Sequence, residues 1–269
     1  MGFFATSGVL NERGFFGEGF DPDALDYINR VETADGERLE PRVRTAINQF
    51  VLGCKQDGTW TSLVTSCIMA GARTVAGAIT PLVGNAPTNN NFVAGDYSRT
   101  LGLLGNGTNK YLNTGYNNND TTNFPQNNSH ISCFVSASQT NATGTLVGGA
   151  TGPGSRITLF HTSSTGISAR NRAISTSTAI FAPMGFQANI RNNSATFTRR
   201  FTLASGITDS LVGATSSAPT TESLGVFGNG GIAYTSARMS FYSIGKSLTL
   251  SSLDSRVTTL MNTLASVIA

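Results

Sequence analysis

The sequence predicts a mainly β protein, an antiparallel sandwich that follows a short helical block and is closed by a C-terminal helix. After residue 128, apolar and polar residues alternate with a period of two in many short segments. Apolar residues recur at helical spacing within residues 21–71 and again within residues 251–269. Ten of the 15 acidic residues precede residue 59, so a charged head leads into a polar body.

Helix start signals mark the charged head. Asp21 is placed as an N-cap before Pro22, and a second proline at position 41 opens another apolar stripe. A third stripe begins at Trp60 and ends near residue 71. Residues 21–71 are therefore expected to form three short amphipathic helices, with Trp60 as a core anchor.

Seven segments of the body alternate as half-buried strands do, and runs of Gly, Asn and Ser separate them. They cover residues 129–138, 143–148, 156–162, 166–172, 185–191, 196–203 and 239–245. Asparagine is frequent between residues 85 and 128, which favours loops and turns there. The predicted division is an arm (1–20), a helical block and linker (21–91), and the sandwich with its terminal helix (92–269).

The arm combines glycines with five phenylalanines and has no helical or strand period. Glycine makes a chain costly to order, and phenylalanine is costly to leave in water. The arm is therefore expected to dock onto a sister subunit or another protein rather than to fold alone. Its predicted docking residues are Phe3, Phe4, Phe15, Phe16 and Phe20.

Composition argues against several classes of partner. A net charge of +3 without a basic block does not predict a nucleic-acid partner. No apolar run approaches the roughly 18 residues of a membrane helix, and no secretory signal is expected at the start. Cys54, Cys67 and Cys133 lack metal-site spacing. Buried free thiols are favoured, with a Cys54–Cys67 bridge as the alternative.

Two segments together resemble a known fold family. "GLLGNGTNKYLNTG" (102–115) and "SHISCFVSAS" (129–138) resemble the opening strands of concanavalin-like jelly rolls of the laminin-G and pentraxin type. "MSFYSIGKSLTLSSLDSRVTTLMNTL" (239–264) resembles that fold's last strand and trailing helix. The resemblance covers roughly residues 92–264 and implies a jelly-roll topology.

A longer phrase precedes that region, "DYINRVETADGERLEPRVRTAINQFVLGCKQDGTWTSLVTSCIMAGART" (26–74). With the jelly roll behind it, this phrase looks like virion proteins of tailed bacteriophages. The resemblance implies a structural protein located in the virion, with other virion proteins as partners. A tail or baseplate fibre or adhesin that contacts host surface glycan is favoured, and a capsid decoration or cement protein is the alternative. A free carbohydrate-binding module is a lesser alternative.

No enzyme is predicted. Retaining glycosidases on concanavalin-like folds need two carboxyl groups about 5–5.5 Å apart. The sandwich region contains only isolated acids, namely Asp96, Asp120, Asp209 and Glu222. The only two histidines, His130 and His161, are not accompanied by a nucleophile motif. No catalytic residue or metal ligand is therefore assigned.

Binding remains open for the asparagine-rich loops. Residues 113–128 are expected to be exposed, and their possible glycan-binding residues are Tyr116, Asn117, Asn118, Asn119 and Phe124. A solvated asparagine loop that binds no ligand is favoured over a glycan-binding loop. No cofactor is predicted, although the resemblance to lectins leaves Ca²⁺ possible on oxygens of Asp96, Asp120 and the adjacent asparagines.

Oligomerisation is expected from the apolar stripes of the head, which the sandwich core is expected to cover only in part. Short isolated helices need tertiary or quaternary burial. By analogy with fibrous phage appendages, a homotrimer is expected, with residues 1–71 making most of the subunit contacts.

Overall fold

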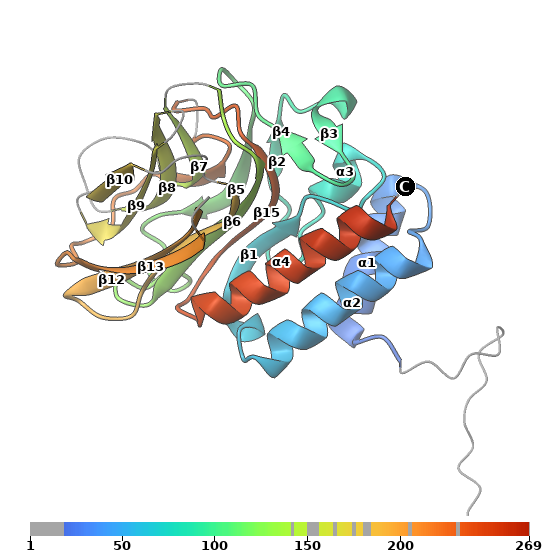
Figure 1. The fold of residues 1–269 in the computed structure, drawn as a ribbon, viewed down its shortest axis with the longest axis horizontal. Coiled ribbons are helices and arrows are strands. Elements are labelled where there is room, and N and C mark those ends of the chain that lie inside the picture. The colour runs from blue at the N-terminus through green and yellow to red at the C-terminus, as the bar shows by residue number, and fades with distance from the viewer. Residues whose placement is uncertain are drawn as a thin grey trace, which may run out of the picture.

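The computed structural model describes residues 19–140, 143–149, 156–163, 166–173, 176–179, 184–203, 206–229 and 232–268. Its helices are α1 (Pro22–Asp35), α2 (Pro41–Gln56), the short α3 (Val75–Ala78) and α4 (Leu250–Val267). Two antiparallel sheets pack face to face, and α1, α2 and α4 lie on the far side of one of them (Figure 1). The predicted β-sandwich with N-terminal helices and a C-terminal helix is confirmed.

The sheet beneath the helices, sheet A, has the order β13-β12-β11-β6-β15-β4-β3, and β1 also pairs with β15. Its strands are β1 (Leu63–Ile68), β3 (Tyr97–Ser98), β4 (Gly102–Leu104), β6 (Ser129–Ala137), β11 (Gly185–Arg191), β12 (Thr196–Leu203), β13 (Gly206–Gly213) and β15 (Arg238–Gly245). The opposite sheet, sheet B, has the order β10-β9-β8-β7-β14-β5-β2. Its strands are β2 (Thr88–Asn90), β5 (Tyr111–Asn117), β7 (Gly144–Gly148), β8 (Arg156–Ser163), β9 (Gly166–Ala173), β10 (Thr176–Ala179) and β14 (Ser223–Val226). All seven predicted strands are present.

The first helix begins and ends at the predicted signals. The Asp21 carboxylate accepts a hydrogen bond from the Asp23 amide at 3.0 Å, and Gly36 ends α1 with a φ of 70°. The last residue of α1 then fixes the next connection. The Asp35 carboxylate accepts the backbone amides of Arg73 and Thr74 at 2.7 and 2.9 Å, which holds α3 beside α1.

The third predicted helix is wrong. Residues 60–62 form one 3-10 turn, and the next six residues form β1, which pairs antiparallel with β15. Cys67 faces the core between the sheets, whereas Ile68 faces the core beneath the helices. Apolar residues therefore lie on both faces of β1 and break the period of two, and their helical spacing is a coincidence.

The predicted boundary at residue 92 does not separate two structural units. β1 pairs with β15, and β2 pairs with β5, so strand pairing crosses that position in both sheets. The sandwich therefore begins at Leu63, and of the predicted helical block only α1 and α2 precede it.

The apolar stripes of the head are covered within the subunit. Ile28, Val43 and Phe50 are buried, and they join Phe186 and Phe241 of sheet A in one core with α4. The premise of the oligomer prediction is thus removed, because the stripes have an intramolecular partner. Leu25 of α1 is 38% exposed.

We expect Gly245→Ala to lower the free energy of unfolding by about 2–3 kcal/mol, because a Cβ there would lie 1.9 Å from the Ser62 carbonyl oxygen. The strain falls where β15 meets the start of β1. Gly95→Ala is the matched control, because a Cβ there has no atom within 4 Å, and its change should stay within about 0.5 kcal/mol. Urea denaturation measures both, and equal values would contradict the packing described.

Candidate docking groove and binding surfaces

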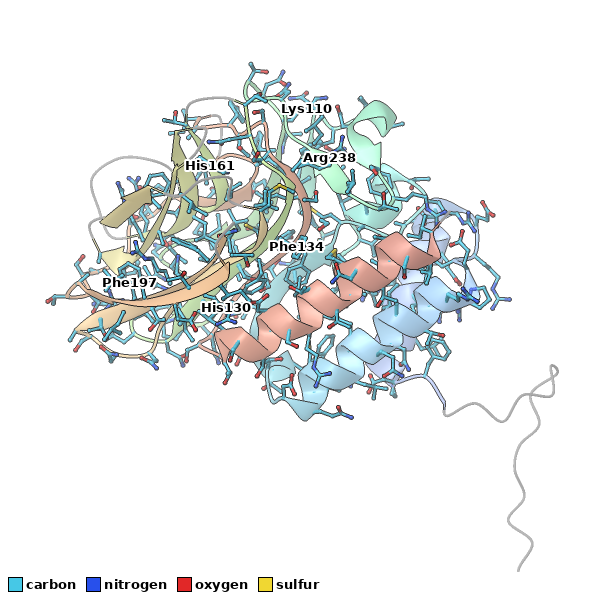
Figure 2. The ribbon with its side chains drawn as sticks, in the orientation of Figure 1. Lys110, His130, Phe134, His161, Phe197 and Arg238 are labelled. Carbon is cyan, nitrogen blue, oxygen red and sulfur yellow. The ribbon has the colours of Figure 1, made fainter. Side chains whose placement is uncertain are left out.

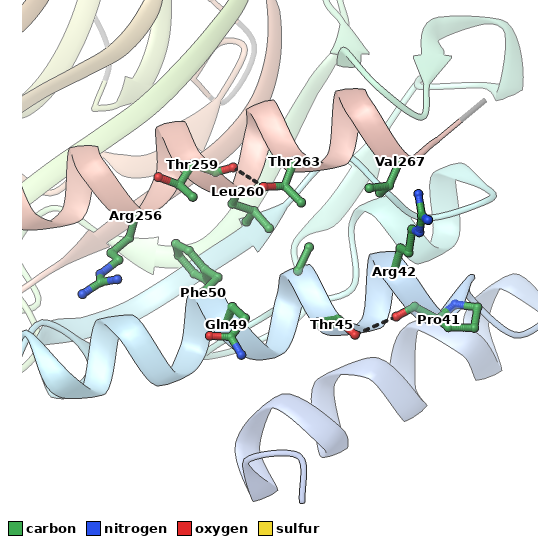
Figure 3. Close-up of a pocket in the computed structure, with 11 residues that line it drawn as sticks. Pro41, Arg42, Thr45, Gln49, Phe50, Arg256, Thr259, Leu260, Thr263 and Val267 are labelled. Atoms are coloured by element: carbon green, nitrogen blue, oxygen red, sulfur yellow. Dashed lines mark hydrogen bonds between the residues drawn. The ribbon is translucent and has the colours of Figure 1, made fainter. Parts of the chain in front are cut away.

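An apolar groove of about 530 Å³ runs between α2 and α4 on the outer surface of the helical layer (Figure 3). Phe50 of α2 and Leu260 of α4 form its floor, and both side chains are almost fully buried. Arg42 and Val267 stand at one end, and Arg256 stands towards the other (Figure 3). Such a volume is typical of sites that enclose a small ligand or a few side chains.

The groove walls are apolar because their hydroxyl groups are already bonded. Thr45 donates to the Pro41 carbonyl at 3.0 Å, and Thr263 donates to the Thr259 carbonyl at 2.8 Å (Figure 3). Each hydroxyl is thereby turned to the backbone of its own helix. What lines the space between the helices is then mostly carbon.

One ion pair fixes the spacing of the two helices. Arg256 donates to both carboxylate oxygens of Asp57, at 2.8 and 2.9 Å, and so ties α4 to the end of α2. The guanidinium crosses α2 at Gly53, where a Cβ would lie 2.7 Å from the Arg256 side chain. Glycine at this position therefore permits the bidentate contact.

The predicted docking arm ends on the same helical layer. Phe3, Phe4, Phe15 and Phe16 lie outside the described residues, whereas Phe20 is half-buried against the helical core. The Arg44 guanidinium lies 5.6 Å from the centre of the Phe20 ring.

Asp21 anchors the next position. Its amide donates to the Asn48 side chain at 2.8 Å, and its carboxylate pairs with Lys55 at 2.7 Å. The chain is therefore fixed to α2 at the point where the arm meets the body.

The predicted sugar-binding loop is corrected in part. Phe124 and Asn118 are fully buried, so the expectation that they are exposed is wrong. Tyr116 is half-buried and packs edge-on against Phe124, with ring centres 5.6 Å apart. Of the five residues, Asn117 and Asn119 remain exposed.

Asn118 is buried because it holds a buried cation. Arg172 of β9 donates to the Asn118 side-chain oxygen at 2.8 Å and to the carbonyls of Asn118 and Phe124, both at 2.6 Å. The same Asn118 oxygen accepts the Ile157 amide at 3.1 Å. Burial lowers the pKa of Arg172 to about 10, and no carboxylate among the described residues forms an ion pair with it. The loop is thus a structural cover over β9.

A different aromatic surface lies on the outer face of sheet B. Tyr111 of β5 and Tyr234 are both half-buried, with ring centres 5.9 Å apart and planes inclined by 52°. Asn90 pairs with Tyr111 across β2 and β5, and Asn113 follows on the same face of β5. Sequence reasoning missed this set because its members come from three separate segments.

The isolated acids are engaged by neighbours. Asp96 pairs with Lys110, Asp209 with Arg200 and Glu222 with Arg156. Asp120 accepts the side-chain amide of Asn123 at 2.7 Å. Within the described residues, no group of three or more His, Cys, Asp or Glu side chains could hold a metal ion.

The two histidines lie apart on different sheets, His130 on β6 of sheet A and His161 on β8 of sheet B (Figure 2). His130 is fully buried, and burial lowers its pKa to about 4. Its Nε2 lies 2.9 Å from the Ser243 hydroxyl, which also bonds Ser132 at 2.7 Å. Its Nδ1 contacts the Lys246 carbonyl rather than a carboxylate. His161 is also buried, which lowers its pKa to about 4.

The structure bears on the predictions about the three cysteines and about membrane-spanning helices. Cys54, Cys67 and Cys133 are buried free thiols, so the alternative bridge is absent. Burial raises the pKa of Cys54 and of Cys67 to about 12. None of the helices in the described ranges combines the length and apolar character needed to cross a bilayer.

No family model and no curated protein sequence matches this chain. A structure of NanB with optactamide is similar with a TM-score of 0.35 and 9% identity, covering 48% of this chain and 24% of that one. Domain 4 of the GH43 extracellular arabinanase AbnA from Geobacillus stearothermophilus, in complex with arabinotriose, has a TM-score of 0.38 and 13% identity. This match covers 65% of this chain and 82% of that domain.

Trypanosoma rangeli sialidase with the inhibitor DANA has a TM-score of 0.39 and 12% identity, covering 81% of this chain and 38% of that one. This chain therefore spans well under two thirds of NanB and of the sialidase. All three TM-scores are below 0.5, so these likenesses carry no argument about function.

We expect Asn118→Ala to lower the free energy of unfolding by about 2–4 kcal/mol, because the buried Arg172 cation loses a side-chain acceptor. Asn119→Ala is the matched control, because Asn119 is exposed, and its effect should stay within about 0.5 kcal/mol. Chemical denaturation of both variants tests this role. A neutral Asn118→Ala would show that the backbone carbonyls alone satisfy the guanidinium.

Proposed function

We propose that this chain is a structural protein of a tailed-bacteriophage virion, a tail or baseplate adhesin whose helical side docks onto the particle. The sandwich would then be displayed outward for contact with host surface glycan. The observation that carries this proposal is the opposition of two surfaces. The groove and the arm attachment lie on the helical side, and the Tyr111–Tyr234 pair lies across the sandwich on sheet B.

The sequence phrase over residues 26–74 supports the virion assignment, because it resembles virion proteins in which such a block precedes the sandwich. The Gly/Phe arm favours an assembled protein over a free carbohydrate-binding module, because docking onto a partner buries phenylalanines that are costly to leave in water. The engagement of the four acids by neighbouring side chains supports a role without catalysis. A capsid decoration protein is the second candidate, because a docking side suits that placement equally.

Three-fold assembly is proposed by analogy with fibrous appendages. The apolar stripes of the helices do not support it, because they are buried within the subunit. Light scattering of the purified chain at micromolar concentration decides it. A trimer mass supports the analogy, and a stable monomer rejects it.

Deletion of residues 2–18 should abolish incorporation into the virion and leave the protein folded. This deletion keeps Phe20 and Asp21, whose contacts belong to the packed body. Circular dichroism checks folding, and immunogold labelling of particles locates the full-length protein. Gold on the tail supports the adhesin, gold over the capsid supports the decoration protein, and unchanged incorporation of the deleted form contradicts the docking role.

Tyr111→Ala and Tyr234→Ala should each weaken glycan binding by about tenfold, equivalent to about 1.4 kcal/mol, because sugar rings stack on such aromatic faces. A glycan array identifies the ligand for wild type, and calorimetry compares the variants. Asn117→Ala with Asn119→Ala is the control for the loop predicted from sequence. If only the asparagine variants lose binding, the site is that loop and the tyrosine pair is not involved.

A further inference from the structure

We infer that the nearer Gly-Phe-Phe of the arm, residues 14–16, folds back over its own subunit and fills the groove between α2 and α4. Phe15 and Phe16 would lie over Phe50 and Leu260, the groove floor. This closure belongs to the free subunit and does not depend on the particle to which the protein docks.

The direction of the chain supports this occupant. Asp21 contacts Asn48 and Lys55, whereas the preceding Phe20 contacts Arg44. Going backwards along the chain, the contacts therefore move towards the N-terminal end of α2. Arg42, near that end of α2, lines one end of the groove (Figure 3).

The tether is long enough. Phe16 precedes Phe20 by four residues, which span at most about 13–14 Å when extended. Neighbouring helical residues point about 100° apart, so the path from Arg44 to the groove residue Thr45 covers little more than a quarter of the helix circumference. On a helix about 10–12 Å across this path is about 10 Å, so Phe16 can reach the groove side of α2. Glycines at positions 14, 17 and 19 permit the tight turn that this path needs.

The chemistry of the two parts is complementary. The groove offers a carbon-lined space, and the arm offers two phenylalanine rings that are costly to leave in water. Arg42, which lines one end of the groove, is exposed. No carboxylate of the described residues forms an ion pair with it. Glu18 supplies a carboxylate between Phe16 and Phe20.

The short tether also favours the chain's own arm over that of a second copy. A segment joined by a short flexible linker has an effective concentration in the millimolar range. At micromolar protein concentration, an arm from another subunit competes poorly for the same groove. The distal Gly-Phe-Phe, at residues 2–4, is left free for an assembly partner.

Trypsin cleavage after Arg13 tests closure, because the residues after the cut are those held in the groove. Thr45→Glu places a charge in the groove and should raise the cleavage rate by about tenfold, equivalent to about 1.4 kcal/mol. Thr33→Glu is the matched control, since Thr33 is also an exposed helical threonine bonded to its own helix. Its rate should stay at the wild-type value. Equal rates in all three proteins would overturn the inference.

Disulfide trapping then identifies the source of the arm. Phe16→Cys combined with Thr45→Cys should form a bond within one chain, whereas Phe16→Cys with Thr33→Cys should not. The native thiols are buried and do not compete. Non-reducing electrophoresis separates the outcomes. A monomer with a new internal bond supports closure within the subunit, and a cross-linked dimer, or equal bonding in both pairs, overturns it.

Discussion

Burial of sheet A on both faces is the constraint on which the rest of the molecule depends. One face meets sheet B, and the other meets α1, α2 and α4 through Phe186 and Phe241. The rings of Phe50 and Phe241 meet edge-on with centres 5.9 Å apart, so the contact between helix and sheet is also the floor of the groove. Removing the helical layer would expose the apolar side chains around Phe186 and Phe241. Helices that come before and after the sandwich in the sequence therefore cover the same face of sheet A.

Hydrophobic periodicity and helix-capping signals predicted the elements whose two faces differ in polarity. β6 follows the alternation because Ile131, Cys133 and Val135 face the core between the sheets and mostly polar residues alternate with them. α1 follows its capping signals. β1 was missed because its apolar residues face both cores, as Cys67 and Ile68 show, and because its pairing with β15 joins residues about 175 positions apart. The groove was equally hidden, since it depends on the spacing that Arg256 and Asp57 impose between helices distant in sequence.

The asparagine loop shows a second limit of sequence reasoning. Composition identified a loop correctly, yet exposure depends on what a loop covers. Arg172 and Arg191 are both fully buried, and their guanidinium groups are held by carbonyl and amide oxygens. The Asn118 side-chain oxygen supplies part of that coordination, whereas Asn171 contributes its backbone carbonyl, so the side chain at position 118 serves the interior rather than the surface. A residue-type count cannot distinguish these uses, because both need the same side chain.

The position of β15 within sheet A has a consequence for how the chain acquires its structure. This strand lies between β6 and β4, also pairs with β1, and starts at residue 238. During synthesis, β1 and β6 must therefore wait until residues 238–245 have left the ribosome before their shared neighbour arrives. Folding of sheet A is consequently late and dominated by distant contacts, which makes it slow. Nascent chains that stop before residue 238 would expose the edges of β6 and β1, and such fragments would require chaperones to stay soluble.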